Sequence, residues 1–289
     1  MPVVRVNGID IWYELRGDGP TLALSHGWIG PTEDWPASVF DLAKHVRLLV
    51  YDVRGQGRTT APEDPDAYSL PIYAQDLRAL LDELDIEQAH IAGVSQGGMI
   101  SAQFAVDFPE RTRSLVLSDS TAGNGQDKGP GGEWERTIRG HFEMMEHIAV
   151  KYGLADLCER RIAYDAANDP HLHDHPDPLE ERQAQERRRY ARLSLHAFVG
   201  TVRAIHNRPD LTARIRELRM PALVIVGEWD GFRPCAERDH KLIEGSRFVL
   251  MRRAGHATDR WRQDAFVPTI ARFVADVEAG RDVAGEFEL

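Results

Sequence analysis

The sequence predicts an α/β fold in which a doubly wound, mostly parallel β-sheet carries an inserted helical lid. Short apolar runs of strand length alternate with helix-like segments through residues 1–120 and again through residues 209–289. A Gly-x-Ser-x-Gly pentapeptide at residues 93–97 joins one of these runs to a helix-like segment. Residues 121–208 differ in character, with a Gly-rich entry followed by charged helical patterns. We therefore expect residues 1–120 and 209–289 to form the core and residues 121–208 to form the lid.

The first elements of the chain are a hairpin and a buried strand. Asn7-Gly8 suits a type I′ turn between two short strands. The strand-like run at residues 21–25 then gives way to His26-Gly27-Trp28. The backbone N–H of Trp28 is placed to hold a developing oxyanion, whereas His26 is better explained as a side chain that holds the loop by hydrogen bonds.

The pentapeptide Gly93-Val94-Ser95-Gln96-Gly97 predicts a serine on a sharp turn between a strand and a helix. Glycine at both ends of the motif permits close packing of helix on strand, where a Cβ would clash. The motif taken alone is better explained by an ordinary strand-to-helix turn. A nucleophilic role for Ser95, with the N–H of Gln96 as a second oxyanion donor, depends on partners elsewhere in the chain.

Those partners follow in the second block of core sequence. A serine needs a histidine base, which in turn needs a carboxylate to fix its tautomer. Asp230 follows the apolar run at residues 223–227, and His256 follows the run at residues 248–251, so both are expected at the same sheet edge as Ser95. Asp119 ends the strand before the lid and is an alternative acid, although the loop around Asp230 fits better.

These motifs together resemble the α/β-hydrolase superfamily, and more narrowly its small bacterial serine hydrolases with a helical lid, which include carboxylesterases, enol-lactonases and cofactor-free perhydrolases. The resemblance covers nearly the whole chain, including the Gly-rich loop at residues 51–58 and the strand that leads into the lid at residues 115–122. It implies a triad of Ser95, Asp230 and His256 with an oxyanion hole at Trp28 and Gln96. Some members of the superfamily take their acid from the position of Asp119.

The lid and the loops beside it contribute candidate pocket residues. On a helical face of the lid, Phe142, Met144 and Met145 either line an acyl pocket or pack on the core. Trp28 is expected to narrow the pocket mouth, and Trp229 is a further candidate pocket residue. The histidines of residues 171–175 lie in a Pro-flanked loop that does not suit a catalytic metal site, so no metal is predicted. The arginine-rich run at residues 186–192 could capture a carboxylate, but its many glutamate neighbours favour a salt-bridged helix face.

Composition excludes several other classes of protein. At 289 residues and 42% hydrophobic residues, the chain can bury one large core and an inserted subdomain. The net charge of −11 argues against nucleic-acid binding, which needs a basic face. No apolar run approaches the length of about 20 residues that a membrane span requires, and the first residues lack a signal-peptide pattern, so we expect a cytoplasmic protein. We expect Cys158 and Cys235 to be reduced, structural cysteines. The sequence implies no organic cofactor, and it is compatible with an oligomer.

The predicted reaction is hydrolysis of a small-molecule ester or lactone through an acyl-enzyme, with activity rising through a pKa of about 6 to 7 as His256 loses its proton. Two alternatives use the same triad. One is a C–C bond hydrolase whose substrate is a ketone, namely a vinylogous diketone. The other is a ligand receptor that keeps a slow triad as a sensor. The acidic tail, residues 280–289, is expected to be frayed.

Overall fold

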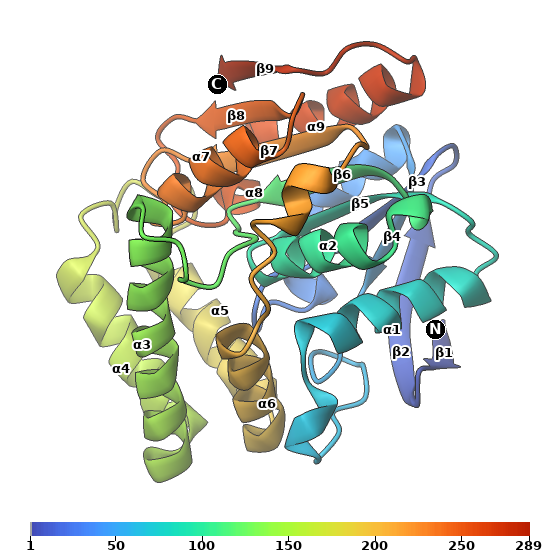
Figure 1. The fold of residues 1–289 in the computed structure, drawn as a ribbon. Helices are drawn as coiled ribbons and strands as arrows, with labels where there is room; N and C mark the ends of the chain where they lie inside the picture. Colours follow the sequence, from blue (N-terminus) through green and yellow to red (C-terminus); the bar gives the residue numbers. More distant parts are fainter. Residues whose placement is uncertain (1) are drawn as a thin grey trace.

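The computed structural model describes residues 2–289, and its centre is one twisted sheet of nine strands (Figure 1). The strand order is β1-β2-β4-β3-β5-β6-β7-β8-β9, antiparallel at β1-β2-β4 and parallel from β4 to β9. The strands are β1 Val3–Val6, β2 Ile9–Arg16, β3 Thr21–Ser25, β4 Arg47–Tyr51, β5 Ala89–Val94, β6 Thr112–Ser118, β7 Ala222–Gly227, β8 Arg247–Met251 and β9 Gly285–Glu288. The predicted mostly parallel α/β sheet is confirmed.

Helices cover both faces of this sheet. The α-helices are α1 Leu70–Glu83, α2 Gln96–Asp107, α3 Pro130–Tyr152, α4 Leu154–Asn168, α5 Leu179–Arg192, α6 Leu195–His206, α7 Arg233–Leu242, α8 Thr258–Trp261 and α9 Gln263–Glu278. Short 3₁₀ helices are η1 Thr32–Asp34, η2 Ala37–Lys44, η3 Pro65–Ala67, η4 Pro109–Arg111 and η5 Arg214–Glu217. Over residues 2–289, no helix combines the length and the apolar character needed to cross a bilayer.

Strand β7 illustrates why the central strands are apolar throughout. Leu223 and Ile225 pack in one cluster with side chains of α9 such as Phe266, whereas Val224 and Val226 pack in another. Successive side chains of a strand point to opposite faces, so a strand covered on both sides needs an apolar residue at every position. In-register pairing then brings the carboxyl ends of β3, β5, β6, β7 and β8 to one edge of the sheet, where the predicted site residues lie.

The two ends of the sheet differ from each other in how well the sequence predicts them. The Asn7-Gly8 turn links β1 to β2, and both residues have positive φ (47° and 80°), as a type I′ turn requires. The expectation of a frayed tail is wrong, because β9 pairs in parallel with β8. Backbone hydrogen bonds at Leu289 and an ion pair of Glu288 with Arg252 hold this last strand in place.

The chain between β6 and β7 contains helices α3 to α6, and we call residues 121–208 the helical insertion. Figure 1 shows α3 to α6 gathered beyond one end of the sheet, apart from the helices that flank it. Helix α3 packs against α4, α6 and α7, while α5 packs against α4. The insertion therefore contacts the core mainly through α7 and the loops that follow the strands.

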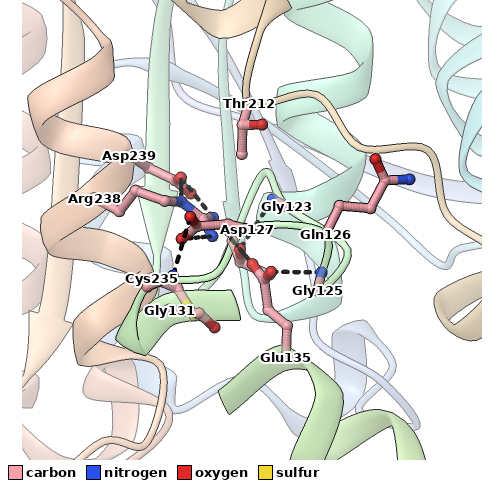
Figure 2. Close-up of polar contacts among 12 residues, drawn as sticks. Gly123, Gly125, Gln126, Asp127, Gly131, Glu135, Thr212, Cys235, Arg238 and Asp239 are labelled. Atoms are coloured by element: carbon pink, nitrogen blue, oxygen red, sulfur yellow. Dashed lines mark hydrogen bonds and ion pairs between the residues drawn. The ribbon is translucent and has the colours of Figure 1, made fainter. Parts of the chain in front are cut away.

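A buried polar cluster ties the start of the insertion to α7 (Figure 2). Glu135 of α3 is fully buried and accepts hydrogen bonds from Thr121, from Arg238 Nη2 at 2.9 Å and from the backbone N–H of Gly125 at 2.7 Å. Arg238 of α7 also donates to the buried Asp239 carboxylate at 2.8 Å. Because each buried carboxylate has charged or N–H partners, the cluster fixes how the insertion leaves the core.

Replacement of Glu135 with leucine is expected to lower the free energy of unfolding by at least about 3 kcal/mol, since it leaves a largely buried arginine without one partner. Denaturant unfolding of the purified variant measures this. The matched control is Glu146→Leu in the same helix, whose exposed pair with Arg203 should contribute less than about 1 kcal/mol. Equal losses in the two variants would show that the cluster does not anchor the insertion.

Candidate active site

The turn between β5 and α2 holds Ser95 in a strained backbone conformation. Its φ of 56° and ψ of −117° are rarely adopted by a residue with a Cβ, and such strain persists where the surrounding structure enforces it. The flanking glycines show how it is enforced. A Cβ on Gly93 would lie 2.1 Å from the carbonyl carbon of Gly97, and a Cβ on Gly97 would lie 2.1 Å from the carbonyl oxygen of Ser25. Only glycine at both positions permits this turn, which raises the Ser95 hydroxyl above the sheet edge.

The structure brings Ser95, His256 and Asp230 together from three separate loops. The Nε2 atom of His256 lies 2.9 Å from Ser95 Oγ, and its Nδ1 lies 3.0 Å from Asp230 Oδ2. Asp230 is held by the backbone N–H of Phe232, which donates to its other oxygen at 3.0 Å. A carboxylate at Nδ1 requires the proton on that nitrogen, which leaves Nε2 free to accept from the serine. This arrangement can activate a hydroxyl as a nucleophile.

Asp119 lies close to these residues but makes no hydrogen bond to His256. It is fully buried with a φ of 50°, and its Oδ2 accepts from the N–H and the hydroxyl of Thr258 at 2.8 and 2.7 Å. Its other oxygen accepts from the N–H of Gly227 at 3.2 Å. Burial, and then the nearby Asp230 carboxylate, raise the pKa of Asp119 to about 7. The side chain therefore holds the loop after His256 in place.

The charge on Asp230 dominates the electrostatics of His256. Burial alone would lower the pKa of His256, but the Asp230 carboxylate, through its charge and its hydrogen bond, raises it to about 9. The imidazole borders the cavity and keeps 43% of its side-chain surface exposed, so solvent weakens this effect. We expect the pKa of His256 to lie between its usual 6.5 and about 9.

Two backbone N–H groups beside Ser95 are free to bind an oxyanion. Gln96 begins α2, so its N–H has no partner within the helix, and the N–H of Trp28 follows β3 on the neighbouring loop. Within residues 2–289, neither amide donates a hydrogen bond, and both residues line the same cavity as Ser95. The positive end of the helix dipole at Gln96 adds to the field that favours negative charge there.

His26 has a structural position below these loops. Its Nε2 accepts from the backbone N–H of Val53 at 2.9 Å, and its Nδ1 lies 2.7 Å from the carbonyl oxygen of Gly27. Burial lowers the pKa of His26, because the surrounding protein disfavours the charged ring. These hydrogen bonds fit the loop-holding role that the sequence predicts for His26. Within residues 2–289, the ring makes no hydrogen bond to Ser95.

A cavity of about 760 Å³ opens beside the Ser95 hydroxyl. Of the predicted pocket residues, Trp28, Phe142, Met145 and Trp229 line it, and the Phe142 ring stands edge-on to Trp28 with centroids 5.0 Å apart. Met144 does not line the cavity; its side chain is 48% exposed on the opposite side of α3. The helical period explains this correction, because Met144 follows Phe142 by two residues and so lies about 200° from it around the helix axis.

Several lining residues could not be found from the sequence. Apolar side chains from α2, α3, α6 and the loop after β7 complete one side of the cavity, and they are Met99, Trp134, Ile138, Ile205 and Phe232. Arg161 of α4 lines the other side. The only available signal was proximity to a predicted catalytic residue, which marks Met99 and Phe232. Trp134, Ile138 and Ile205 lie far from the motifs in sequence, and their approach depends on the packing of the insertion.

The loop at residues 169–178 covers part of the cavity through two histidines. His171 stacks on Trp229 with ring centroids 3.6 Å apart and an angle of 1°, and His175 stands edge-on to Trp261 at 4.6 Å. Trp229 directly precedes Asp230, and Trp261 follows His256 by five residues. The loop at residues 169–178 therefore packs on the segments that carry Asp230 and His256. Across the part of the chain that the structure describes, no three His, Cys, Asp or Glu side chains form a group suited to a metal ion.

Comparisons with known proteins show the family and the fold of this chain. The family model for the alpha/beta hydrolase fold matches residues 20–258. A pimeloyl-(acyl-carrier protein) methyl ester esterase of Aeromonas hydrophila subsp. hydrophila is 29% identical over 264 residues, which are 90% of this chain and 98% of that protein. The crystal structure of an enol-lactonase from Burkholderia xenovorans LB400 is similar with a TM-score of 0.77 at 25% identity, covering 95% of this chain and 100% of that one. A hydrolase structure from Pseudomonas aeruginosa PA01 has a TM-score of 0.76 at 27% identity, covering 94% and 97%.

The match of the family model extends from β3 to the loop that carries His256, and thus spans the sheet edge on which the candidate site is built. The relatives are named as an esterase, a lactonase and a hydrolase, and each is covered over nearly its whole length. The chain belongs to the α/β-hydrolase family of enzymes.

Proposed function

We propose that this enzyme hydrolyses a carboxylic ester or lactone through an acyl-enzyme formed on Ser95. The observation that carries the proposal is the continuous hydrogen-bond chain from Ser95 Oγ through His256 to Asp230, beside two unpaired backbone amides. An esterase and an enol-lactonase among the relatives support the same reaction class.

In the first half of the reaction, Ser95 Oγ bonds to the substrate carbonyl carbon while its proton passes to His256 Nε2. The N–H groups of Trp28 and Gln96 bind the oxygen that becomes negative, and Asp230 stabilises the imidazolium. Collapse of the intermediate breaks the bond to the leaving alkoxide, which takes the proton from His256. Water then repeats these steps on the acyl-enzyme, releasing the acid and restoring Ser95.

The helical insertion acts as a lid in this proposal. Phe142 and Met145 of α3 are buried and line the cavity above the Ser95 hydroxyl, so the insertion supplies the apolar surface for an acyl chain. An anchored α3 keeps this surface in place, because Glu135 fixes the start of the helix to α7. Exclusion of water by such a surface strengthens the electrostatic interactions below it.

A panel of p-nitrophenyl esters and small lactones, with a vinylogous diketone beside them, tests the proposal. We expect multiple turnovers on at least one ester or lactone and none on the diketone. Turnover of the diketone alone would contradict ester hydrolysis and favour C–C bond cleavage. A single slow turnover on every compound would favour the ligand receptor.

The pH dependence of kcat/KM should follow the neutral form of His256. Because a raised pKa keeps the imidazole protonated to higher pH, activity should rise with pH, with a midpoint above 6.5 and no higher than about 9. Removal of the Asp230 charge should move the midpoint of any residual activity downward. Initial rates across the pH range measure both. A midpoint below 6.5 in the parent would contradict the dominance of Asp230 over burial.

A further inference from the structure

Arg161 of α4 stands at the point where two cavities meet beside the nucleophile. It lines the main cavity and also a smaller cavity of about 190 Å³, which is lined in addition by the loop containing Trp28 and by Asp259 of α8. Ser95 and His256 line both cavities as well. Arg161 therefore places a positive charge on the wall of the cavity into which the Ser95 hydroxyl opens.

One edge of the Arg161 guanidinium is held and the other is free. Its Nη1 donates to Glu186 Oε1 at 2.9 Å and to the hydroxyl of Tyr190 at 2.8 Å. The group lies over the ring of Trp28, with Cζ 5.6 Å from the centroid. Among the hydrogen bonds of residues 2–289, none uses Nε or Nη2 of Arg161. Its held edge fixes the orientation, and the remaining donors are available to a ligand.

The acids around Arg161 do not occupy this free edge. Glu186 accepts from Arg161 on one oxygen and from Arg189 on the other, at 3.4 Å, and Arg189 also pairs with Asp34 at 2.8 Å. Asp165, one helical turn beyond Arg161, lies exposed at the cavity rim and forms no hydrogen bond with it in the described residues. The cavity wall therefore offers unused donors of Arg161, while Glu186 is bound by two arginines and Asp165 lies exposed without a hydrogen bond to Arg161.

We propose that Arg161 binds a carboxylate on the acyl portion of the substrate, so that the enzyme selects half-esters of dicarboxylic acids. This inference rests on the proposed ester hydrolysis and names the substrate class for it. Two N–H donors of one guanidinium match the two oxygens of a carboxylate. A neutral acyl chain of equal length has no group that can accept from these donors. The apolar side of the cavity, including Phe142 and Met145, then holds the methylene chain.

The test compares paired substrates on parent, Arg161→Gln and Arg187→Gln enzymes. Monomethyl succinate, glutarate, adipate and pimelate are each assayed beside the methyl alkanoate in which a methyl group replaces the carboxylate. Arg187 is the matched control, because it pairs with Glu159 across the same two helices but on their exposed side. Calorimetry adds the dissociation constants of the dicarboxylates and of the corresponding monocarboxylates, which do not depend on turnover.

We expect the parent to prefer at least one half-ester, and Arg161→Gln to reduce that preference in kcat/KM by about tenfold to a hundredfold, as for loss of hydrogen bonds to a charged group. Dicarboxylate binding should weaken by the same factor, and Arg187→Gln should leave both ratios within about twofold. If circular dichroism shows that Arg161→Gln is misfolded, Arg161→Lys replaces it; a single ammonium cannot hold Glu186 and the ligand together, so the preference should fall again.

A parent without preference for any half-ester, or an unchanged ratio in the position-161 variant, would overturn the inference while leaving ester hydrolysis intact. If the parent cleaves no ester at all, the proposed reaction fails. In that case the binding measurement still tests the role of Arg161. Dicarboxylate binding that does not weaken in Arg161→Gln would overturn the inference of a carboxylate site.

Discussion

Replacement of Ser95 with alanine is expected to lower kcat on esters by about 10⁴- to 10⁶-fold without loss of the fold. The hydroxyl is the atom to which His256 Nε2 is hydrogen-bonded at 2.9 Å, and no other described side chain donates to that nitrogen. The strained turn requires small neighbours and not the serine hydroxyl, so alanine fits the same backbone. Steady-state kinetics with circular dichroism of both proteins gives the comparison.

The matched control is Ser101→Ala, one turn into the same helix. Its hydroxyl donates to the carbonyl oxygen of Gly97 at 2.9 Å and does not reach the cavity wall. We expect this variant to keep its activity within about threefold of the parent, since the lost bond is one within a helix. Activity of Ser95→Ala at the level of this control would mean that hydrolysis proceeds without the serine nucleophile.

Asp230→Asn is expected to lower kcat by about 10⁴-fold, by analogy with a buried aspartate in a serine triad. An asparagine amide accepts the Nδ1–H hydrogen bond only when its oxygen, and not its NH₂ group, faces the ring. It also lacks the charge that stabilises the imidazolium. The same loss removes the main cause of the raised pKa of His256. Turnover numbers measured above pH 9, where the parent imidazole is neutral, separate the loss of charge from a simple pH shift.

Asp119→Asn is the isosteric comparison for the second buried acid. Because Asp119 hydrogen-bonds Thr258 and not His256, we expect a loss within about tenfold, caused by movement of the loop that carries His256. A severe loss in Asp119→Asn with near-normal activity in Asp230→Asn would move the acid to the end of β6.

The sequence predicts the sheet and the candidate triad well because both depend on local patterns. The run of β7 is apolar at each position because both of its faces are buried, and Asp230 follows where such a strand ends. Gly93 and Gly97 mark the turn at Ser95 because a Cβ at either site meets backbone at 2.1 Å. Each signal lies within a few residues of the feature that it predicts.

The cavity could not be predicted in the same way. Phe142 and Met145 face it while Met144 points away, which depends on the rotation of α3 about its own axis. Arg161 lines the same cavity as Ser95 only through the packing of α4 on α5, and a single arginine on a charged helix carries no sequence signal. The sequence does not predict the tail strand β9, because β9 is held by pairing with β8, which lies more than 30 residues earlier in the chain.

The most direct test of an acyl-enzyme on Ser95 is covalent labelling by a serine-directed alkyl phosphonate, followed by peptide mass spectrometry. The phosphonate phosphorus bonds to the activated serine oxygen and expels its leaving group, so the label needs the hydroxyl, His256 and the free amides of the oxyanion site. We predict one adduct, on the peptide that contains residues 93–97, in the parent and none in Ser95→Ala. Labelling of Ser95→Ala to the same extent as the parent, or an adduct on a different serine, would contradict the account.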